Sequence, residues 1–144
     1  MSIFTDWLIA TEAEAASVAM IDSTQERSYK DWPHLALQGI GLMEFEHLAA
    51  IVRGDGDNAR AMVGELLHQA TEEGPFVAAV DPAFIDGLAA LADTSLSNVA
   101  TSWQQSDYLR EWPLPELTRT LGHIVAFARR SRQAEKAVLQ LMTM

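Results

Sequence analysis

The strongest constraint on the fold is an amphipathic segment near the end of the sequence. Its apolar side chains recur three or four residues apart and form one stripe: Leu117, Leu121, Ile124, Val125 and Ala128. This period predicts a helix from Pro115 to about Gln133, introduced by the rigid segment Trp112–Glu116 (WPLPE). The chain is therefore expected to contain at least one long helix with a side that faces the core.

Four short segments have the composition of β-strands. Ser2–Ala10 is aromatic and β-branched, His34–Ile40 follows a Trp-Pro pair, and Pro75–Val80 is apolar and bounded by Gly and Asp-Pro. The tail, Ala137–Met144, either continues the long helix or forms a last strand. We favour the strand, because its apolar residues crowd together instead of following a period near 3.6.

Further helices are predicted between these strands. Thr11 with Glu14 three residues later fits a capping box, and Asp81 followed by Pro82 fits a helix start. The helical segments are Leu42–Arg53, Ala59–Glu72, Pro82–Ala92 and Leu96–Gln105. The sequence thus predicts a mixed α/β (α+β) fold: a single compact domain over residues 1–144, helix-rich, with a small sheet of three or four short strands. The expected core includes Phe45, Leu66, Leu88, Leu121 and Ile124.

Composition limits the setting and the chemistry. The chain has 144 residues, 49% of them hydrophobic, which is enough to cover a sizeable core without a metal or a disulfide. The absence of cysteine excludes disulfides, thiolate metal sites and cysteine nucleophiles, and it fits a reducing cytoplasm. Asp6, Glu12 and Glu14 interrupt the apolar runs near the start, so we expect no secretory signal and no membrane span.

Charge is distributed unevenly along the chain. The net charge is −10, and residues 1–80 hold 13 acidic and 4 basic residues against 7 and 6 in residues 81–144. A field of this sign repels phosphate backbones, so no nucleic-acid partner is expected, whereas a basic protein would be attracted. The simpler alternative is that an acidic surface keeps a small bacterial protein soluble.

The spacing Glu-x-x-His occurs twice, at Glu44/His47 and at Glu65/His68. Carboxylate-bridged di-iron proteins present half of their metal site in this way, with all ligands facing inward. On helical wheels both pairs lie away from the apolar stripes of Leu42–Arg53 and Ala59–Glu72. We therefore expect all four side chains to be exposed, and we expect no metal or cofactor.

Other motifs give no catalytic assignment. The loop Asp55–Asn58 lacks the glycine and the glutamate that an EF-hand needs, and no nucleotide-binding or nucleophile-elbow motif is present. A basic group near the end of the long helix comprises Arg129, Arg130, Arg132 and Lys136. It is expected to interact with the helix dipole, and the alternative is a small patch for an anion or an acidic partner.

Two Trp-Pro turns are candidates for partner binding. They are Lys30–Pro33 and Arg110–Pro113, and their candidate residues are Asp31, Trp32, Glu111 and Trp112. Exposed tryptophans are frequent binding hot spots. Tryptophans in turns also serve as lids on a core, and that alternative stays open.

Two functional classes remain. The first is a non-enzymatic acidic binding or regulatory protein that acts on a basic protein partner, as an immunity protein or an antitoxin does. The alternative is a small hydrolase or ligand-binding enzyme with a pocket near Trp32, His34, Glu44 and His47. The sequence does not assign catalytic residues or an oligomeric state.

Overall fold

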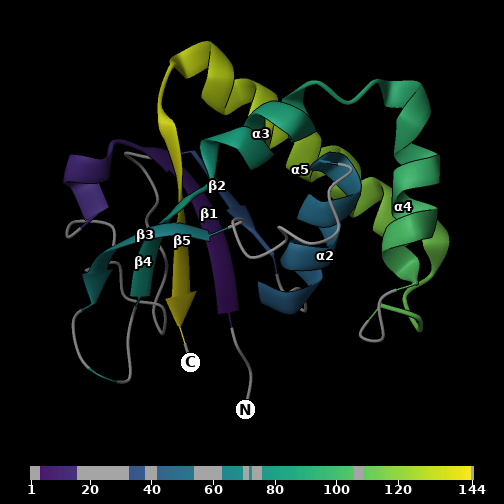
Figure 1. The fold of residues 1–144 in the computed structure, drawn as a ribbon, viewed down its shortest axis with the longest axis horizontal. Coiled ribbons are helices and arrows are strands. Elements are labelled where there is room, and N and C mark those ends of the chain that lie inside the picture. Colours follow the sequence, from purple (N-terminus) through teal and green to yellow (C-terminus); the bar gives the residue numbers. More distant parts are fainter. Residues whose placement is uncertain are drawn as a thin grey trace.

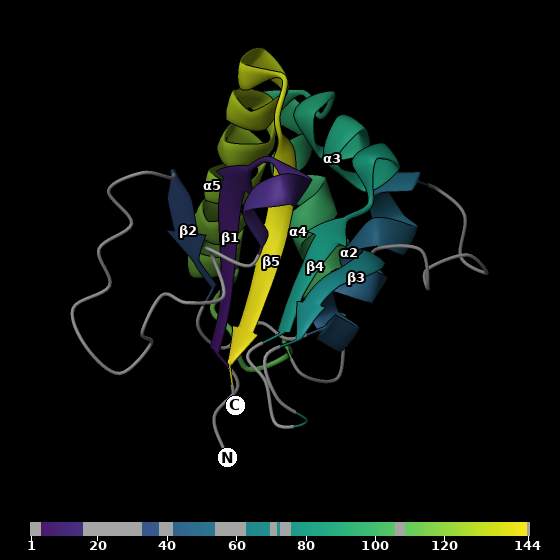
Figure 2. The same ribbon diagram turned by 90° about the vertical axis from the view of Figure 1, so that its left-hand side faces the viewer.

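The computed structural model describes residues 4–15, 33–37, 42–53, 63–69, 72, 76–105 and 109–143. Five strands form one antiparallel sheet in the order β2-β1-β5-β4-β3. Helices α2, α3, α4 and α5 all lie on one face of this sheet (Figures 1 and 2). The prediction of a helix-rich mixed α/β domain is confirmed, but the described sheet has five strands where three or four were expected.

Most elements lie within the predicted segments, but β2 ends at Ala36 and α3 at Ala89, both earlier than predicted, and β3 replaces a predicted helix. The strands are β1 (Phe4–Ala10), β2 (His34–Ala36), β3 (Val63–Gln69), β4 (Phe76–Val80) and β5 (Ala137–Thr143). The helices are α2 (Leu42–Arg53), α3 (Pro82–Ala89), α4 (Leu96–Gln104) and α5 (Leu114–Ala134), with short 3-10 turns η1 (Glu12–Glu14) and η3 (Asp93–Ser95). None of the described helices is both long and apolar enough to cross a bilayer.

The first and last strands pair at the centre of the sheet. Their register runs from Phe4 opposite Thr143 to Ala10 opposite Ala137. Alternate residues of β5 belong to different clusters, with Val138 in the core beneath the helices and Leu139 in a second cluster on the opposite face. Because both faces of β5 are buried, its apolar residues follow one another directly, and this confirms the tail as a strand.

The core beneath the helices is centred on aromatic side chains. The ring of Trp7 stacks on Phe45 at 5.0 Å between centroids and meets the edge of Phe84 at 6.2 Å. The predicted stripe of α5 is buried throughout: Leu117, Leu121, Ile124, Val125 and Ala128. Phe45, Leu88, Leu121 and Ile124 are confirmed as core, while the side chain of Leu66 lies outside the described residues.

The predicted helix Ala59–Glu72 is wrong where the structure describes this segment, because Val63–Gln69 is strand β3. The apolar spacing of Leu66 and Leu67 resembled a helical period. The pairing of β3 with β4 shifts register at two places, and such irregularities break the alternation by which a strand is recognised. Val63 and Gly64 were signals against a helix, since both have low helix propensity.

Local hydrogen bonds and backbone geometry fix the start of α3 and the end of α5. Asp81 accepts a hydrogen bond from the backbone N–H of Ala83 at 3.1 Å, which confirms the predicted start of α3. At the end of α5, Glu135 adopts a left-handed conformation with φ of 56°. The hydroxyl of Ser131 then donates to the carbonyl of Lys136 at 2.6 Å, and the chain turns directly into β5.

Candidate functional site

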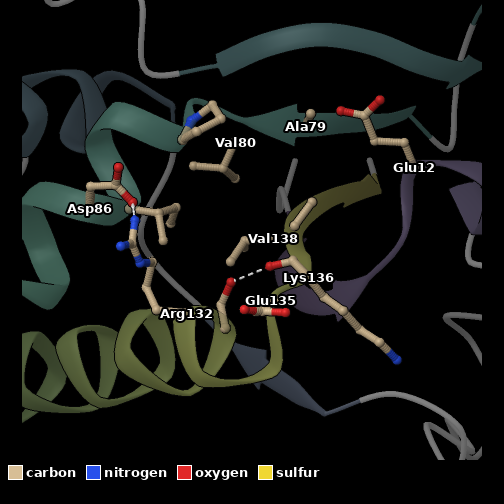
Figure 3. Close-up of a pocket in the computed structure, with 12 residues that line it drawn as sticks. Glu12, Ala79, Val80, Asp86, Arg132, Glu135, Lys136 and Val138 are labelled. Carbon is tan, nitrogen blue, oxygen red and sulfur yellow. Dashed lines mark hydrogen bonds and ion pairs between the residues drawn. The ribbon is translucent and has the colours of Figure 1, made fainter.

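A hollow lies where β4 and β5 meet the ends of α3 and α5 (Figure 3). We call it the α3–α5 hollow, and its volume is about 400 Å³. Its floor is apolar and comes from the buried side chains of Val80, Ile85 and Val138. Its rim is polar and comes from η1, α3 and the turn between α5 and β5, which are segments far apart in the sequence.

The charged groups at the rim differ in whether they have an ion-pair partner. Arg132 forms an ion pair with Asp86 along one side of the α3–α5 hollow (Figure 3). Glu12 and Glu135 are exposed, and in the part of the chain that the structure describes neither carboxylate has a hydrogen-bond or ion-pair partner. The ammonium group of Lys136 points away from the other lining side chains (Figure 3).

This arrangement suits a side chain with an apolar stem and a cationic end. The stem of a lysine or arginine is commonly buried along apolar surface while its charged head stays at the rim. An exposed cation, Arg132, already lines the hollow and pairs there with Asp86 (Figure 3). The unpaired carboxylates of Glu12 and Glu135 are the groups left to receive a cation from outside.

The basic group at the end of α5 does more than interact with its own helix. Arg129 donates to the carbonyl of Ala89 at 3.2 Å and to that of Leu91, and it pairs with Asp93 at 3.1 Å. These carbonyls lie at the C-terminal end of α3, where cationic donors are favourable. Together with the Arg132–Asp86 pair, these contacts tie α5 to α3 and fix one wall of the α3–α5 hollow.

A smaller hollow of about 270 Å³ lies between β2 and α5 and is called the β2–α5 hollow. It is lined by His34, Leu35, His123, Ala126, Phe127 and Arg130. It therefore brings together two histidines that are far apart in the sequence. The predicted pocket near Trp32, His34, Glu44 and His47 is not tested as a unit, since Trp32 and the side chain of Glu44 lie outside the described residues.

The predicted partner-binding residues are only partly described. Asp31 and Trp32 lie outside the described residues, and Glu111 is exposed. Trp112 is half-buried and packs against the core beneath the helices, and its carbonyl accepts a hydrogen bond from Gln104 at 2.7 Å. These contacts fit the lid alternative for Trp112, and a role in partner binding stays a prediction.

The expected exposure of the Glu-x-x-His histidines is wrong, since His47 and His68 are both half-buried. His68 lies opposite Val77 in the sheet, so a helical wheel does not apply to it. His47 lies on α2, which packs against both α3 and α4 and is partly covered at its sides. The side chains of Glu44 and Glu65 are not described, and among the described residues no three His, Asp or Glu side chains gather as a metal site.

Sequence patterns did not indicate Glu12 and Glu135 as a pair. They are far apart in the sequence and line the same hollow because β1 and β5 pair side by side. A non-glycine residue at the left-handed end of a helix is the one local feature that distinguishes Glu135. It becomes visible only with the backbone geometry.

Comparison with known proteins does not assign this chain to a family. No family model and no curated protein matches the chain. Among solved structures the chain is similar to YfbM from Escherichia coli, a protein of unknown function, with 14% sequence identity and a TM-score of 0.46. The similarity covers 99% of this chain and 100% of that one, and at this level it carries no inference about activity.

Proposed function

We propose that this protein is a non-enzymatic binding protein that acts on a basic protein partner, in the manner of an immunity protein or an antitoxin. The observation that carries the proposal is the α3–α5 hollow, which combines an apolar floor with the unpaired carboxylates of Glu12 and Glu135. A lysine or arginine of the partner would lay its stem on the floor and bring its cation to these two groups.

The charge of the chain supports the same proposal at longer range. Residues 1–80 contain 13 acidic and 4 basic residues, and such an imbalance attracts a basic surface and accelerates its association. Asp31, Trp32, Glu111 and Trp112 are proposed as further contacts of this partner. We propose a cytoplasmic setting in a bacterium; the absence of cysteine fits the reducing compartment but does not bear on the source.

The alternative, a small hydrolase or ligand-binding enzyme, rests on one observation. The β2–α5 hollow gathers His34 and His123, and histidine is the commonest general acid or base. An assay of the purified protein on ester and phosphate substrates distinguishes the two classes. Turnover that is lost in both His34→Ala and His123→Ala would support the enzyme.

The proposal is tested by capture of the partner from a lysate of the source organism. The baits are the natural chain, the double variant Glu12→Gln/Glu135→Gln, and a control, Glu72→Gln/Glu116→Gln, which removes two exposed carboxylates away from the hollow. We expect the natural and control baits to retain one basic protein. The double variant should bind that protein at least about tenfold more weakly.

Salt provides the second arm of this test. Attraction between exposed charges is screened over about 10 Å at 0.1 M salt, so the affinity of the natural chain should fall steeply as salt is added. The double variant should show a shallower dependence on salt. A partner that is held equally by all three baits, or whose affinity does not change with salt, would contradict the role assigned to the α3–α5 hollow.

A further inference from the structure

The β2–α5 hollow has basic and apolar side chains that the proposed protein partner does not explain. Helix α5 holds three arginines close together, and two of them, Arg129 and Arg132, bind groups of α3 or of η3. Arg130 lies on a different side of α5. It is exposed, and within the described part of the chain its guanidinium has no hydrogen-bond or ion-pair partner.

Helical geometry brings a second nitrogen donor to the same side. His123 precedes Arg130 by seven residues, which is close to two turns, so the two side chains leave α5 in nearly the same direction. Ala126 lies between them, and its small side chain leaves the space open. The hollow of about 270 Å³ is therefore flanked by an imidazole and a guanidinium.

The remaining walls come from β2 and from the core. Phe127 is 7% exposed, and Leu35 is half-buried against the same core, so these two side chains form an apolar wall. Leu35 lies opposite Trp7 in the register of β1 and β2, whereas His34 lies opposite Leu8 of the other face. By this alternation His34 contributes to the rim of the hollow at the edge of the sheet and not to its wall.

The charged side chains among the described lining residues are basic. Arginine is always cationic and presents a planar fork of donors that matches an oxyanion, and an imidazole donates from at least one ring nitrogen. No carboxylate is among the lining residues that the structure describes. Helix-dipole stabilisation is a weaker explanation for Arg130, since that effect is confined to the last turn, where Arg132 is the basic residue.

We infer that the β2–α5 hollow binds a small organic oxyanion, that is, a phosphate or carboxylate carried on a short apolar group. The oxyanion lies between Arg130 and His123 above Ala126. The apolar group lies against Phe127 and Leu35. This ligand differs in charge and size from the basic protein proposed above, and the two sites share no residue.

The inference is tested by NMR titration of the full-length protein with four probes: phenyl phosphate, benzoate, inorganic phosphate and benzyl alcohol. Saturable shifts are expected for the ring of His123 with phenyl phosphate or with benzoate in the millimolar range. The tighter of these two identifies the oxyanion. Inorganic phosphate and benzyl alcohol, which each lack one half of the ligand, should bind distinctly more weakly.

Variants assign the binding to the hollow. Arg130→Gln should weaken the affinity at least about tenfold, because a charge-assisted fork is lost. The control is Arg119→Gln, since Arg119 is exposed on the same helix but does not line the hollow, and its affinity should be unchanged. Arg130→Lys, which keeps the charge and loses the fork, should fall between the natural chain and Arg130→Gln.

Four outcomes would overturn the inference. They are no saturation with either aryl anion, equal loss in Arg130→Gln and Arg119→Gln, binding of benzyl alcohol as tight as that of the aryl anions, and inorganic phosphate binding equal to phenyl phosphate. Arg130 is exposed, so its variants should keep the thermal midpoint of the natural chain, which separates loss of binding from loss of fold.

Discussion

At the scale of single residues, the most unusual feature of the core is a buried amide. Gln140 is fully buried in the central strand β5, and its carbonyl oxygen Oε1 accepts a hydrogen bond from Nε1 of Trp7 at 3.0 Å. Its other amide atom, Nε2, has no hydrogen-bond partner in the described structure. A buried polar group without a partner costs about 1–3 kcal/mol. The hydrogen bond from Trp7 to Gln140 is therefore offset in part by the cost of burying Nε2.

A double variant measures how far these two residues depend on each other. Trp7→Phe should destabilise the protein, because it removes the indole and leaves both amide atoms of Gln140 buried without partners. Adding Gln140→Leu to Trp7→Phe should then recover about 1–2 kcal/mol in the free energy of unfolding, measured in urea. If the double variant is no more stable than Trp7→Phe alone, the side-chain amide of Gln140 has other hydrogen-bond partners in Trp7→Phe.

At the scale of elements, α3 is held closely between two neighbours. Arg129 and Arg132 of α5 bind one side of it. On another side Gly87 lies so near α2 that a Cβ atom added there would approach Cγ1 of Val52 to 2.6 Å. The side chain of Val52 is short and branched, so it has little freedom to move away. The glycine is therefore needed for the close packing of α3 against α2.

This contact predicts a result opposite to helix propensity. Alanine is favoured over glycine within a helix by about 1 kcal/mol, yet Gly87→Ala should lower the free energy of unfolding by about 1 kcal/mol through overpacking. In a Val52→Ala background the same substitution should be neutral or stabilising, since the obstructing methyl group is gone. Thermal unfolding of the natural chain, the two single variants and the double variant tests this prediction. A stabilised Gly87→Ala single variant would show that the helices separate easily.

The elements that the sequence predicted well are those whose patterns depend on local chemistry. The caps at Thr11 and Asp81 and the stripe of α5 follow from hydrogen-bonding rules and from a regular period. Strand β3 was missed because its irregular pairing with β4 hides the alternation of a strand. A pairing partner elsewhere in the chain, and not propensity, decides the conformation of that segment.

At the scale of the whole molecule, the two hollows could not be predicted from the sequence, and the reason is the same for both. Each is assembled by the sheet from distant segments: η1 with the turn after α5, and β2 with the outer side of α5. The basic group at the end of α5 was recognised in the sequence. Which of its side chains bind α3 and which face solvent depends on how α5 packs. Fold class follows from local patterns, whereas such sites follow from topology.

The same topology makes the last strand essential to the whole fold. Strand β5 lies between β1 and β4, so a chain that ends at Lys136 would leave β1 with β2 and β4 with β3 as separate two-stranded pairs. Such pairs are at best marginally stable. The truncated chain should lose its cooperative unfolding transition and the near-ultraviolet signal of the buried Trp7 and Trp103. Adding a peptide of residues 137–144 in excess should restore both, because it supplies the missing centre of the sheet. A cooperative transition without the peptide would instead show that the helices form a stable unit independent of β5.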